Sequence, residues 1–246
     1  MKILALDTSS NACSAALLQG NQQDFSCVER FEIAPRKHTQ LILPMIDSVL
    51  NEAGLDIKQV DVLAFGRGPG AFTGVRVATG IIQAIAYGAD LKVAQISSLA
   101  AIAQGFYRNR GQLSVEKVLV ANDARMAEIY FGAYELKNGF MSLVGDEQVL
   151  KPEQLESFLL QQSIQADQNW QITGNGWSVY AEQLSAVSKQ CHFSDQQLAD
   201  GSNSYPHARE IAWLAFKEAA DNALVSAEQV SPVYLRDNVA KKPQQK

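Results

Sequence analysis

Cysteine and histidine are scarce in this sequence of 246 residues, and neither is arranged as a metal site. The three cysteines, Cys13, Cys27 and Cys191, are odd in number, widely spaced and form no Cys-x-x-Cys pair. Neither a disulfide framework nor a thiolate zinc site is therefore expected. The three histidines have no i, i+4 spacing that would place two imidazoles on one helical face. The sequence predicts no metal site and a reducing, cytoplasmic compartment.

Long apolar runs and an excess of basic charge are absent as well. No apolar stretch approaches the roughly 20 residues that a membrane-spanning helix needs, so no membrane association is expected. The net charge is −5; residues 1–110 hold ten basic and nine acidic residues, and residues 111–246 hold eleven and seventeen. An acidic chain without a basic stripe binds a phosphate backbone poorly. Contact with nucleic acid is therefore expected only through a partner.

The hydrophobic content of 47% is enough for a folded core, and the length allows two lobes. Both halves open on the same pattern, which is an apolar strand, an aspartate, a polar turn and a second strand. It occurs at residues 4–18 and again at 120–134, with Asp7 and Asp123 as the aspartates. The pattern predicts an internal duplication. The lobe boundary is expected between Phe106 and Glu116, where the apolar periodicity is lost.

Two predicted helices in the first half, at 38–53 and 75–87, carry a large apolar surface. The second has only a thin polar line, formed by Arg76, Thr79, Gln83 and Tyr87. A helix that is apolar almost all round needs cover on two sides, which either the neighbouring helix or another chain would provide. Further helices are expected at 98–103, 152–161, 177–189 and 206–223.

The most informative motif is the glycine-rich segment Gly66–Gly74, between a predicted strand and the second of these helices. Glycines let backbone amides approach an anion, and a helix N-terminus adds a favourable dipole. However, the segment lacks the Lys-Ser/Thr of a P-loop, and the next strand ends at Ser97 rather than at the acid of a dinucleotide site. Two interpretations remain open: a phosphate-binding loop that uses Gly68 and Gly70, or a closely packed strand-to-helix turn.

Asp7, Thr8 and Ser9 offer a carboxylate and two hydroxyls at a strand end. This set suits a magnesium-bound phosphate, and it equally suits an aspartate that caps its own hairpin. No nucleophile, base and orienting group can be identified together, so no catalytic residue is predicted. His38 is expected to be a structural residue before a helix. His192 and His207 have no evident carboxylate partner.

Five segments are recognisable in combination: MKILALDTSS at 1–10, HTQLILP at 38–44, GRGPGAFTGVR at 66–76, DAR at 123–125 and PVYLR at 232–236. Together they resemble the TsaB (YeaZ) family of bacterial tRNA threonylcarbamoyladenosine biosynthesis. The resemblance implies a two-lobed α/β fold of the actin-like, sugar-kinase and Hsp70-like class, with duplicated mixed-sheet domains. The lobes are expected at 1–108, joined by a C-terminal helix at 207–223, and at 109–206, followed by a flexible tail at 237–246.

The resemblance also implies a non-catalytic scaffold that dimerises with the catalytic subunit TsaD and recruits the ATPase TsaE. TsaD transfers threonylcarbamoyl to adenosine 37 of tRNAs that decode ANN codons, and tRNA would be contacted only through the complex. The chain alone would form a homodimer. The implied partner interface lies on the first two helices and comprises Leu41, Met45, Val49, Val75, Ala78, Ile82 and Ile85.

The resemblance implies no cofactor apart from ATP or ADP at the partner interface. The residues that would hold the nucleotide are Asp7, Thr8, Ser9, Gly68 and Gly70. TsaD carries a His-x-x-x-His metal pair; counted on from the glycine loop, the corresponding positions here are Ser98 and Ile102. Serine is a poor ligand for iron or zinc, and isoleucine cannot be one.

Two other functions are weighed against the scaffold. One is a nucleotide-binding enzyme of the actin-like class, motivated by Asp7, Thr8 and the glycine loop. The other is a glycoprotease-like peptidase that acts on its paralogue, for which the sequence supplies neither a nucleophile nor a metal site.

Overall fold

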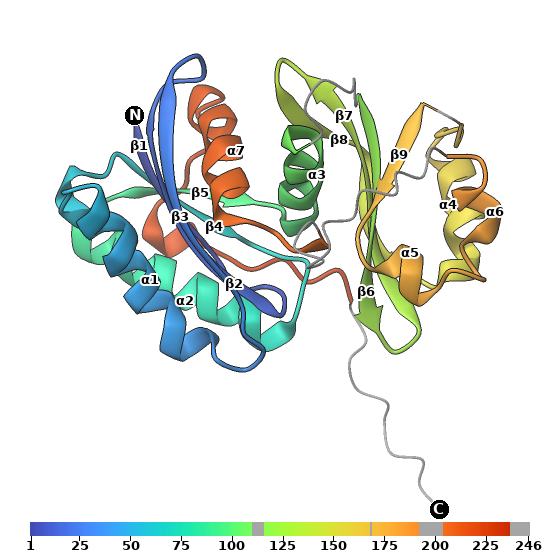
Figure 1. Ribbon diagram of the computed structural model, residues 1–246, viewed down its shortest axis with the longest axis horizontal. Helices are drawn as coiled ribbons and strands as arrows, with labels where there is room; N and C mark the ends of the chain where they lie inside the picture. Colours follow the sequence, from blue (N-terminus) through green and yellow to red (C-terminus); the bar gives the residue numbers. More distant parts are fainter. Residues whose placement is uncertain (110–115, 168, 192–203, 237–246) are drawn as a thin grey trace, which may run out of the picture.

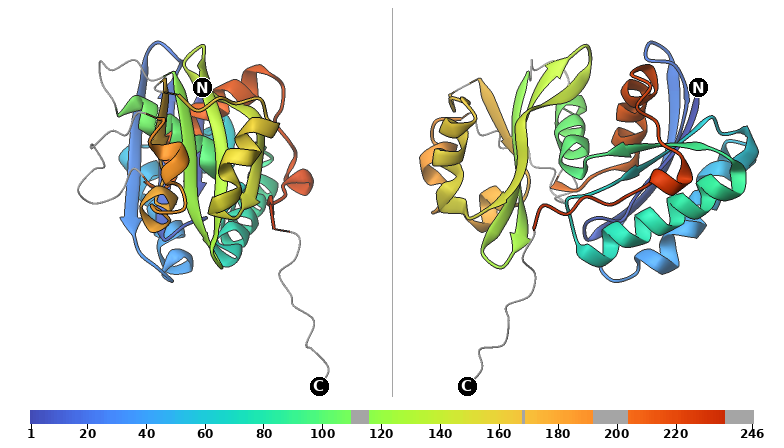
Figure 2. Two further views of the ribbon diagram at one scale, coloured as in Figure 1. Left: turned by 90° about the vertical axis from the view of Figure 1, so that its right-hand side faces the viewer. Right: turned by 180° about the vertical axis from the view of Figure 1, so that it is seen from behind.

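The structure is a computed structural model, which describes residues 1–109, 116–167, 169–191 and 204–236. Two β-sheets enclose a pair of helices, and further helices cover the outer side of each sheet (Figure 1 and Figure 2). The expected tail at 237–246, His192 and most of the expected lobe boundary lie outside the described residues.

The first sheet has the strand order β3-β2-β1-β4-β5. Its strands are β1 (Lys2–Asp7), β2 (Ala12–Gly20), β3 (Phe25–Ile33), β4 (Val62–Gly66) and β5 (Lys92–Ile96). β1 pairs antiparallel with β2 and parallel with β4, so it is the central strand of the lobe. Its side chains alternate between two apolar clusters, because successive residues of a strand point to opposite faces.

Helices cover both faces of this sheet. Leu4 and Leu6 pack against α1 (His38–Glu52) and α2 (Phe72–Ala89) on the outer face. Ile3 and Ala5 pack against α7 (Ala208–Ala220) on the inner face. The first lobe therefore takes one of its covering helices from near the C-terminus.

The second sheet has the order β8-β7-β6-β9. Its strands are β6 (Lys117–Arg125), β7 (Glu128–Lys137), β8 (Phe140–Leu150) and β9 (Trp170–Thr173). The short helices α4 (Leu155–Gln161), α5 (Gly176–Val179) and α6 (Ser185–Ser188) pack on its outer side. The inner side is covered by α3 (Ser98–Arg108), whose Leu99, Ile102 and Phe106 are buried against the sheet. α3 also packs against α7, so the two inner helices join the lobes.

The four strands of the second sheet pair in the same way as β3, β2, β1 and β4 of the first, which confirms the predicted duplicated fold of the two-lobed actin-like class. β6 is antiparallel to β7 and parallel to β9, as β1 is to β2 and β4. The register places Asp7 directly after the last parallel pair of β1, whereas Ala121 follows the last parallel pair of β6. Asp123 lies two residues further along. The two aspartates are therefore not at equivalent positions.

Several predicted helix bounds were wrong. The helix expected at 177–189 is two four-residue helices, because Tyr180 leaves the helical conformation at φ −118° and ψ 40° and donates its hydroxyl to Asp123. α3 continues to Arg108, past the expected end at Ala103, because Phe106 is buried with the second sheet. α2 begins at Phe72 and α7 covers only Ala208–Ala220.

Candidate functional site

The end of β1, the end of β4 and the start of α3 meet at one edge of the first sheet. Parallel neighbours end at the same edge, so Asp7 at the end of β1 lies beside Gly66 at the end of β4. The Ser97 hydroxyl caps α3 there by accepting hydrogen bonds from the backbone amides of Leu99 and Ala100. The structure thus brings Asp7, Thr8, Ser9 and the glycine loop together.

Asp7 is buried, with 1% of its surface exposed. Burial raises the pKa of its carboxyl to about 7, although the amide and hydroxyl of Ser9 donate hydrogen bonds that lower it. These bonds are 2.9 Å to Oδ1 from the amide and 3.0 Å to each oxygen from the hydroxyl. Asp7 therefore caps its own turn, as one of the two interpretations predicted, and its burial favours the protonated carboxyl.

The turn after Asp7 also packs directly against the glycine loop. Thr8 donates its hydroxyl to the carbonyl of Gly74 at 2.6 Å, and Ala71 donates its amide to the carbonyl of Ser9 at 2.6 Å. A Cβ on Gly70 would lie 2.2 Å from the Ser9 carbonyl oxygen, and a Cβ on Gly74 would lie 1.9 Å from that of Thr8. Both glycines are needed because two backbone segments approach each other closely.

Gly66 and Gly68 have similar explanations. A Cβ on Gly66 would lie 1.8 Å from Oδ2 of Asp7, and one on Gly68 would lie 2.7 Å from the carbonyl oxygen of Val233. Gly68 also has a φ of 103°, which disfavours other residues. Each of the four glycines of the motif is thus accounted for by contacts within the chain. The geometry favours the closely packed turn over a phosphate loop.

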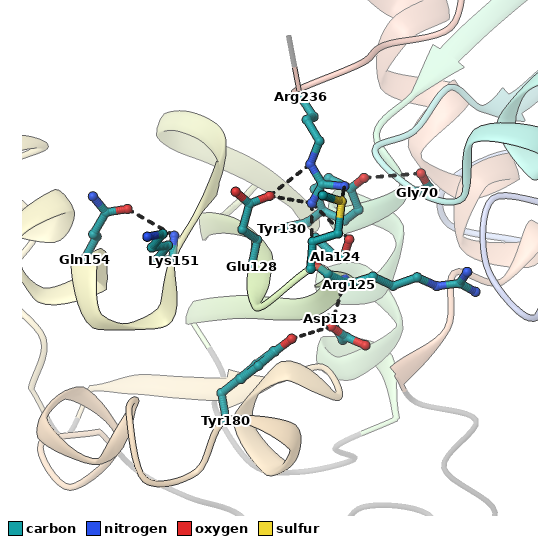
Figure 3. Close-up of polar contacts among 11 residues, drawn as sticks. Gly70, Asp123, Ala124, Arg125, Glu128, Tyr130, Lys151, Gln154, Tyr180 and Arg236 are labelled. Carbon is teal, nitrogen blue, oxygen red and sulfur yellow. Dashed lines mark hydrogen bonds and ion pairs between the residues drawn. The ribbon is translucent and has the colours of Figure 1, made fainter. Parts of the chain in front are cut away.

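The second lobe reaches this site through β7 and the β6–β7 hairpin (Figure 3). Tyr130 donates its hydroxyl to the carbonyl of Gly70 at 3.4 Å. Asp123 belongs to the hairpin itself, because its Oδ1 accepts the Arg125 amide and the Tyr180 hydroxyl, both at 2.8 Å. Asp7 and Asp123 therefore serve different local structures, one in each lobe.

Ser98 and Ile102, the two positions at which the resemblance implied a missing metal pair, are both buried. Ser98 donates its hydroxyl to the hydroxyl of Ser9 at 2.9 Å. Ile102 packs in the apolar cluster between α3 and the second sheet. Within residues 1–109, 116–167, 169–191 and 204–236, no three His, Cys, Asp or Glu side chains group as metal ligands would.

The predicted partner interface needs correction. Five of its seven residues are buried inside the first lobe, against its own sheet, and only Leu41 and Ile85 are partly exposed. The buried five are Met45, Val49, Val75, Ala78 and Ile82. The apolar excess on these helices is mostly explained by core packing, because each helix covers the sheet and contacts the other helix.

The exposed face of the same helices carries a different set of residues. On α2 it presents Gly80, Ala84 and Gly88 at intervals of four, beside Tyr87, which is 75% exposed. A Cβ on Gly80 or Gly88 would meet no atom within 4 Å. Sequence reasoning did not single out this face, although Gly80 inside the predicted helix was a signal, since a glycine within a helix costs about 1 kcal/mol relative to alanine.

The histidine prediction was wrong for His207. Its Nδ1 lies 3.3 Å from Oε2 of Glu29, and its ring stacks on Phe31 at 4.0 Å. The carboxylate comes from β3, 178 residues away in sequence, so no local pattern could reveal it. His38 is the first residue of α1.

Comparison with known proteins gives a consistent result. Residues 31–244 match the family model described as "TsaD: tRNA N6-adenosine threonylcarbamoyltransferase". The tRNA threonylcarbamoyladenosine biosynthesis protein TsaB of Escherichia coli K12 is 39% identical over 98% of this chain and 96% of its own length. The TsaB of Haemophilus influenzae is also 39% identical, over 97% and 95%. The chain belongs to the TsaB family.

Solved structures support the same assignment. YeaZ from Pseudomonas aeruginosa is 40% identical, with a TM-score of 0.79 over 95% of this chain and 99% of that chain. A second Pseudomonas structure, described as an uncharacterized protein with similarity to peptidase YEAZ, has a TM-score of 0.78 at 40% identity, over 96% and 99%. Membership of the TsaB family places the chain in tRNA modification, in the biosynthesis of threonylcarbamoyladenosine.

Proposed function

We propose that this TsaB-family chain is a non-catalytic subunit that dimerises with TsaD and recruits TsaE for threonylcarbamoyl transfer to adenosine 37 of tRNA. The relatives are named for this biosynthesis, and the matching family model is that of the transferase itself. The observation that carries the proposal is the exposed face of α2, formed by Gly80, Ala84, Tyr87 and Gly88. Leu43 of the neighbouring helix α1 is also exposed, at 50%.

This face has the properties of a helix-docking surface. Gly80 and Gly88 do not pack against the rest of the chain, so their cost to the helix is not offset within the described residues. Small side chains let another helix approach closely, and ridges of larger side chains then pack into the groove between them. A homologous subunit offers similar helices. In the absence of that subunit, a second copy of this chain would use the same face to form a homodimer.

The surroundings of Ser98 and Ile102 support a non-catalytic role. Ser98 and Ile102 occupy the positions at which TsaD carries its metal pair. The Ser98 hydroxyl is hydrogen-bonded to Ser9, and Ile102 packs in an apolar cluster. Transfer chemistry would then belong to the partner, and tRNA would be bound by the complex rather than by this acidic chain alone.

A nucleotide-dependent enzyme is the second candidate, and the buried Asp7 beside the glycine loop favours it. The contacts of Thr8, Ser9 and Val233 with the loop count against it for the isolated chain. ATP or ADP is therefore proposed to bind only where the partner completes the site. ATP turnover by the isolated chain that Asp7→Ala abolishes would establish the enzyme instead.

A peptidase finds less support. Burial raises the pKa of Cys13 and Cys27 to about 12 and that of Cys191 to about 11, so none provides a thiolate at neutral pH. Cleavage of purified TsaD in the presence of a chelator would reverse this conclusion.

Within the described parts of the chain, no helix is long and apolar enough to cross a bilayer. We propose that the protein acts in the cytoplasm, because the tRNA that TsaD would modify is there.

The docking face is tested by Ala84→Arg. Ala84 is exposed, so the variant is expected to fold with an unchanged unfolding midpoint. A bulky charge in the middle of a helix contact should abolish both co-purification with TsaD and the homodimer in sedimentation. When the variant is added to a reaction that contains TsaD and TsaE, it should support less tRNA modification than the natural chain does.

Leu160→Arg is the matched control, because Leu160 is 70% exposed on α4 of the other lobe. It should bind TsaD as the natural chain does. Association of the Ala84→Arg chain at natural affinity would refute the docking face. Ala78→Arg and Ile82→Glu, at two positions of the interface that the resemblance implied, are unsuitable because both side chains are fully buried, so loss of binding would only report unfolding.

A further inference from the structure

The segment from Ser231 to Arg236 runs from the first lobe to the second. At its start, Ser231 donates its amide to Oε1 of Gln95 at 2.8 Å. Val233 then donates its amide to the carbonyl of Arg67 at 2.8 Å, and its own carbonyl lies over Gly68. The backbone of this half of the segment is thus held by the Gln95 side chain of β5 and by the glycine loop.

Tyr234 attaches the segment to the first turns of α2. Its ring centre lies 5.6 Å from that of Phe72, and its hydroxyl accepts a 2.8 Å hydrogen bond from Nε of Arg76. The guanidinium of Arg76 lies 3.6 Å above the ring of Phe72. Tyr234 thus joins two side chains of α2 that are distant from it in sequence, in one stacked set that includes a cation–π contact.

Arg236 attaches the other end to the β6–β7 hairpin of the second lobe (Figure 3). Its Nε and Nη2 both donate to Oε2 of Glu128, at 2.9 and 2.5 Å. Nη2 also lies 3.1 Å from the carbonyl oxygen of Ala124 and 3.4 Å from that of Arg125. The Arg236 side chain is only 18% exposed, so solvent screens this ion pair less than one at the surface.

We propose that residues 231–236 form a clasp that fixes the second lobe relative to α2 and the glycine loop. The clasp has three anchors, which are the Arg67 carbonyl, the Phe72–Arg76 pair and the Glu128 hairpin, and it is continuous between them. Its middle covers Gly68 and its end holds the hairpin just before β7, whose Tyr130 reaches Gly70. Opening of the lobes at the glycine loop therefore requires release of Arg236. The inference does not depend on the proposed partner.

Amide hydrogen exchange of the full chain tests the clasp. In Arg236→Ala, the amide of Val233 and the amides of hairpin residues 124–130 should exchange about tenfold faster, because loss of a partly buried charged contact of this kind lowers the local opening free energy by that order. Amides in β1 and β4 should exchange at the natural rate. Arg236→Lys should lie between, since lysine keeps the charge without the planar fork.

Arg125→Ala is the matched control, because it removes one positive charge from the hairpin that Arg236 contacts, while the backbone carbonyl of residue 125 still faces Arg236. Its exchange rates should equal those of the natural chain. Two results would overturn the clasp. One is an unchanged rate at Val233 and in the hairpin of Arg236→Ala; the other is equal acceleration in β1 and β4, which would show that Arg236 contributes only to global stability.

Discussion

Replacement of Gly74 by alanine is expected to destabilise the protein by about 4 kcal/mol or more, enough to prevent folding of many domains. The added Cβ would lie 1.9 Å from the carbonyl oxygen of Thr8. That oxygen is backbone, in a turn whose Thr8 hydroxyl is bonded to Gly74 itself, so no flexible side chain can move aside. The turn and the start of α2 would have to separate. Chemical denaturation, or yield of soluble protein if none folds, measures the effect.

Gly80→Ala on the same helix is the control. A Cβ there would meet no atom within 4 Å, so the substitution should stabilise the chain by roughly 1 kcal/mol through helix propensity. The two substitutions add the same methyl group to the same helix, and opposite signs are expected. If Gly74→Ala were as stable as the natural chain, the close approach of Thr8 to the loop would be wrong.

Asp7→Asn is expected to change the pH dependence of stability. Burial raises the pKa of Asp7 from 3.8 to about 7, so the folded state holds the proton more tightly than the unfolded state. The stability that follows is fully present below pH 3.8 and is lost as the pH rises through about 7. The difference corresponds to about 4 kcal/mol as an order of magnitude. Asparagine cannot ionise, so the free energy of unfolding of Asp7→Asn should not decrease in this way as the pH rises.

The free energy of unfolding, measured by denaturant between pH 4 and pH 8, gives the comparison. The variant should gain stability relative to the natural chain as the pH rises, with most of the gain complete just above pH 7. Asp47→Asn, which removes an exposed carboxylate from α1, controls for general loss of charge. Parallel curves for the natural chain and Asp7→Asn would show that Asp7 is charged at little cost in the folded protein.

Most of the fold could be predicted because its signals are local. Apolar segments predicted strands in the first and second halves, and the repeat of strand, aspartate and hairpin indicated the duplication that strand order confirms. Helix ends were less predictable, since α3 continues to Arg108 only because Phe106 meets a sheet formed later in the sequence. Tyr180 likewise interrupts a helix to reach Asp123.

The sequence predicted which residues form the candidate site, but not which groups these residues contact. The sequence identified Asp7, Thr8, Ser9 and the glycines, and they do lie together. It could not show that the space beside each glycine is occupied by the chain itself, because Thr8, Ser9 and Val233 are distant in sequence. The interface residues that the resemblance implied on α2 are mostly buried, whereas the face that we propose for docking is exposed and carries Gly80 and Gly88.

The late position of α7 has a consequence for synthesis on the ribosome. Strands β1, β2 and β4 are complete by residue 66, yet the helix that covers their inner face begins at Ala208. All strands of the second sheet, and α3 beneath them, leave the exit tunnel before α7 does. The second lobe can therefore fold before the first lobe is complete. Until α7 is synthesised, the inner face of the N-terminal sheet exposes aliphatic side chains, to which chaperones bind.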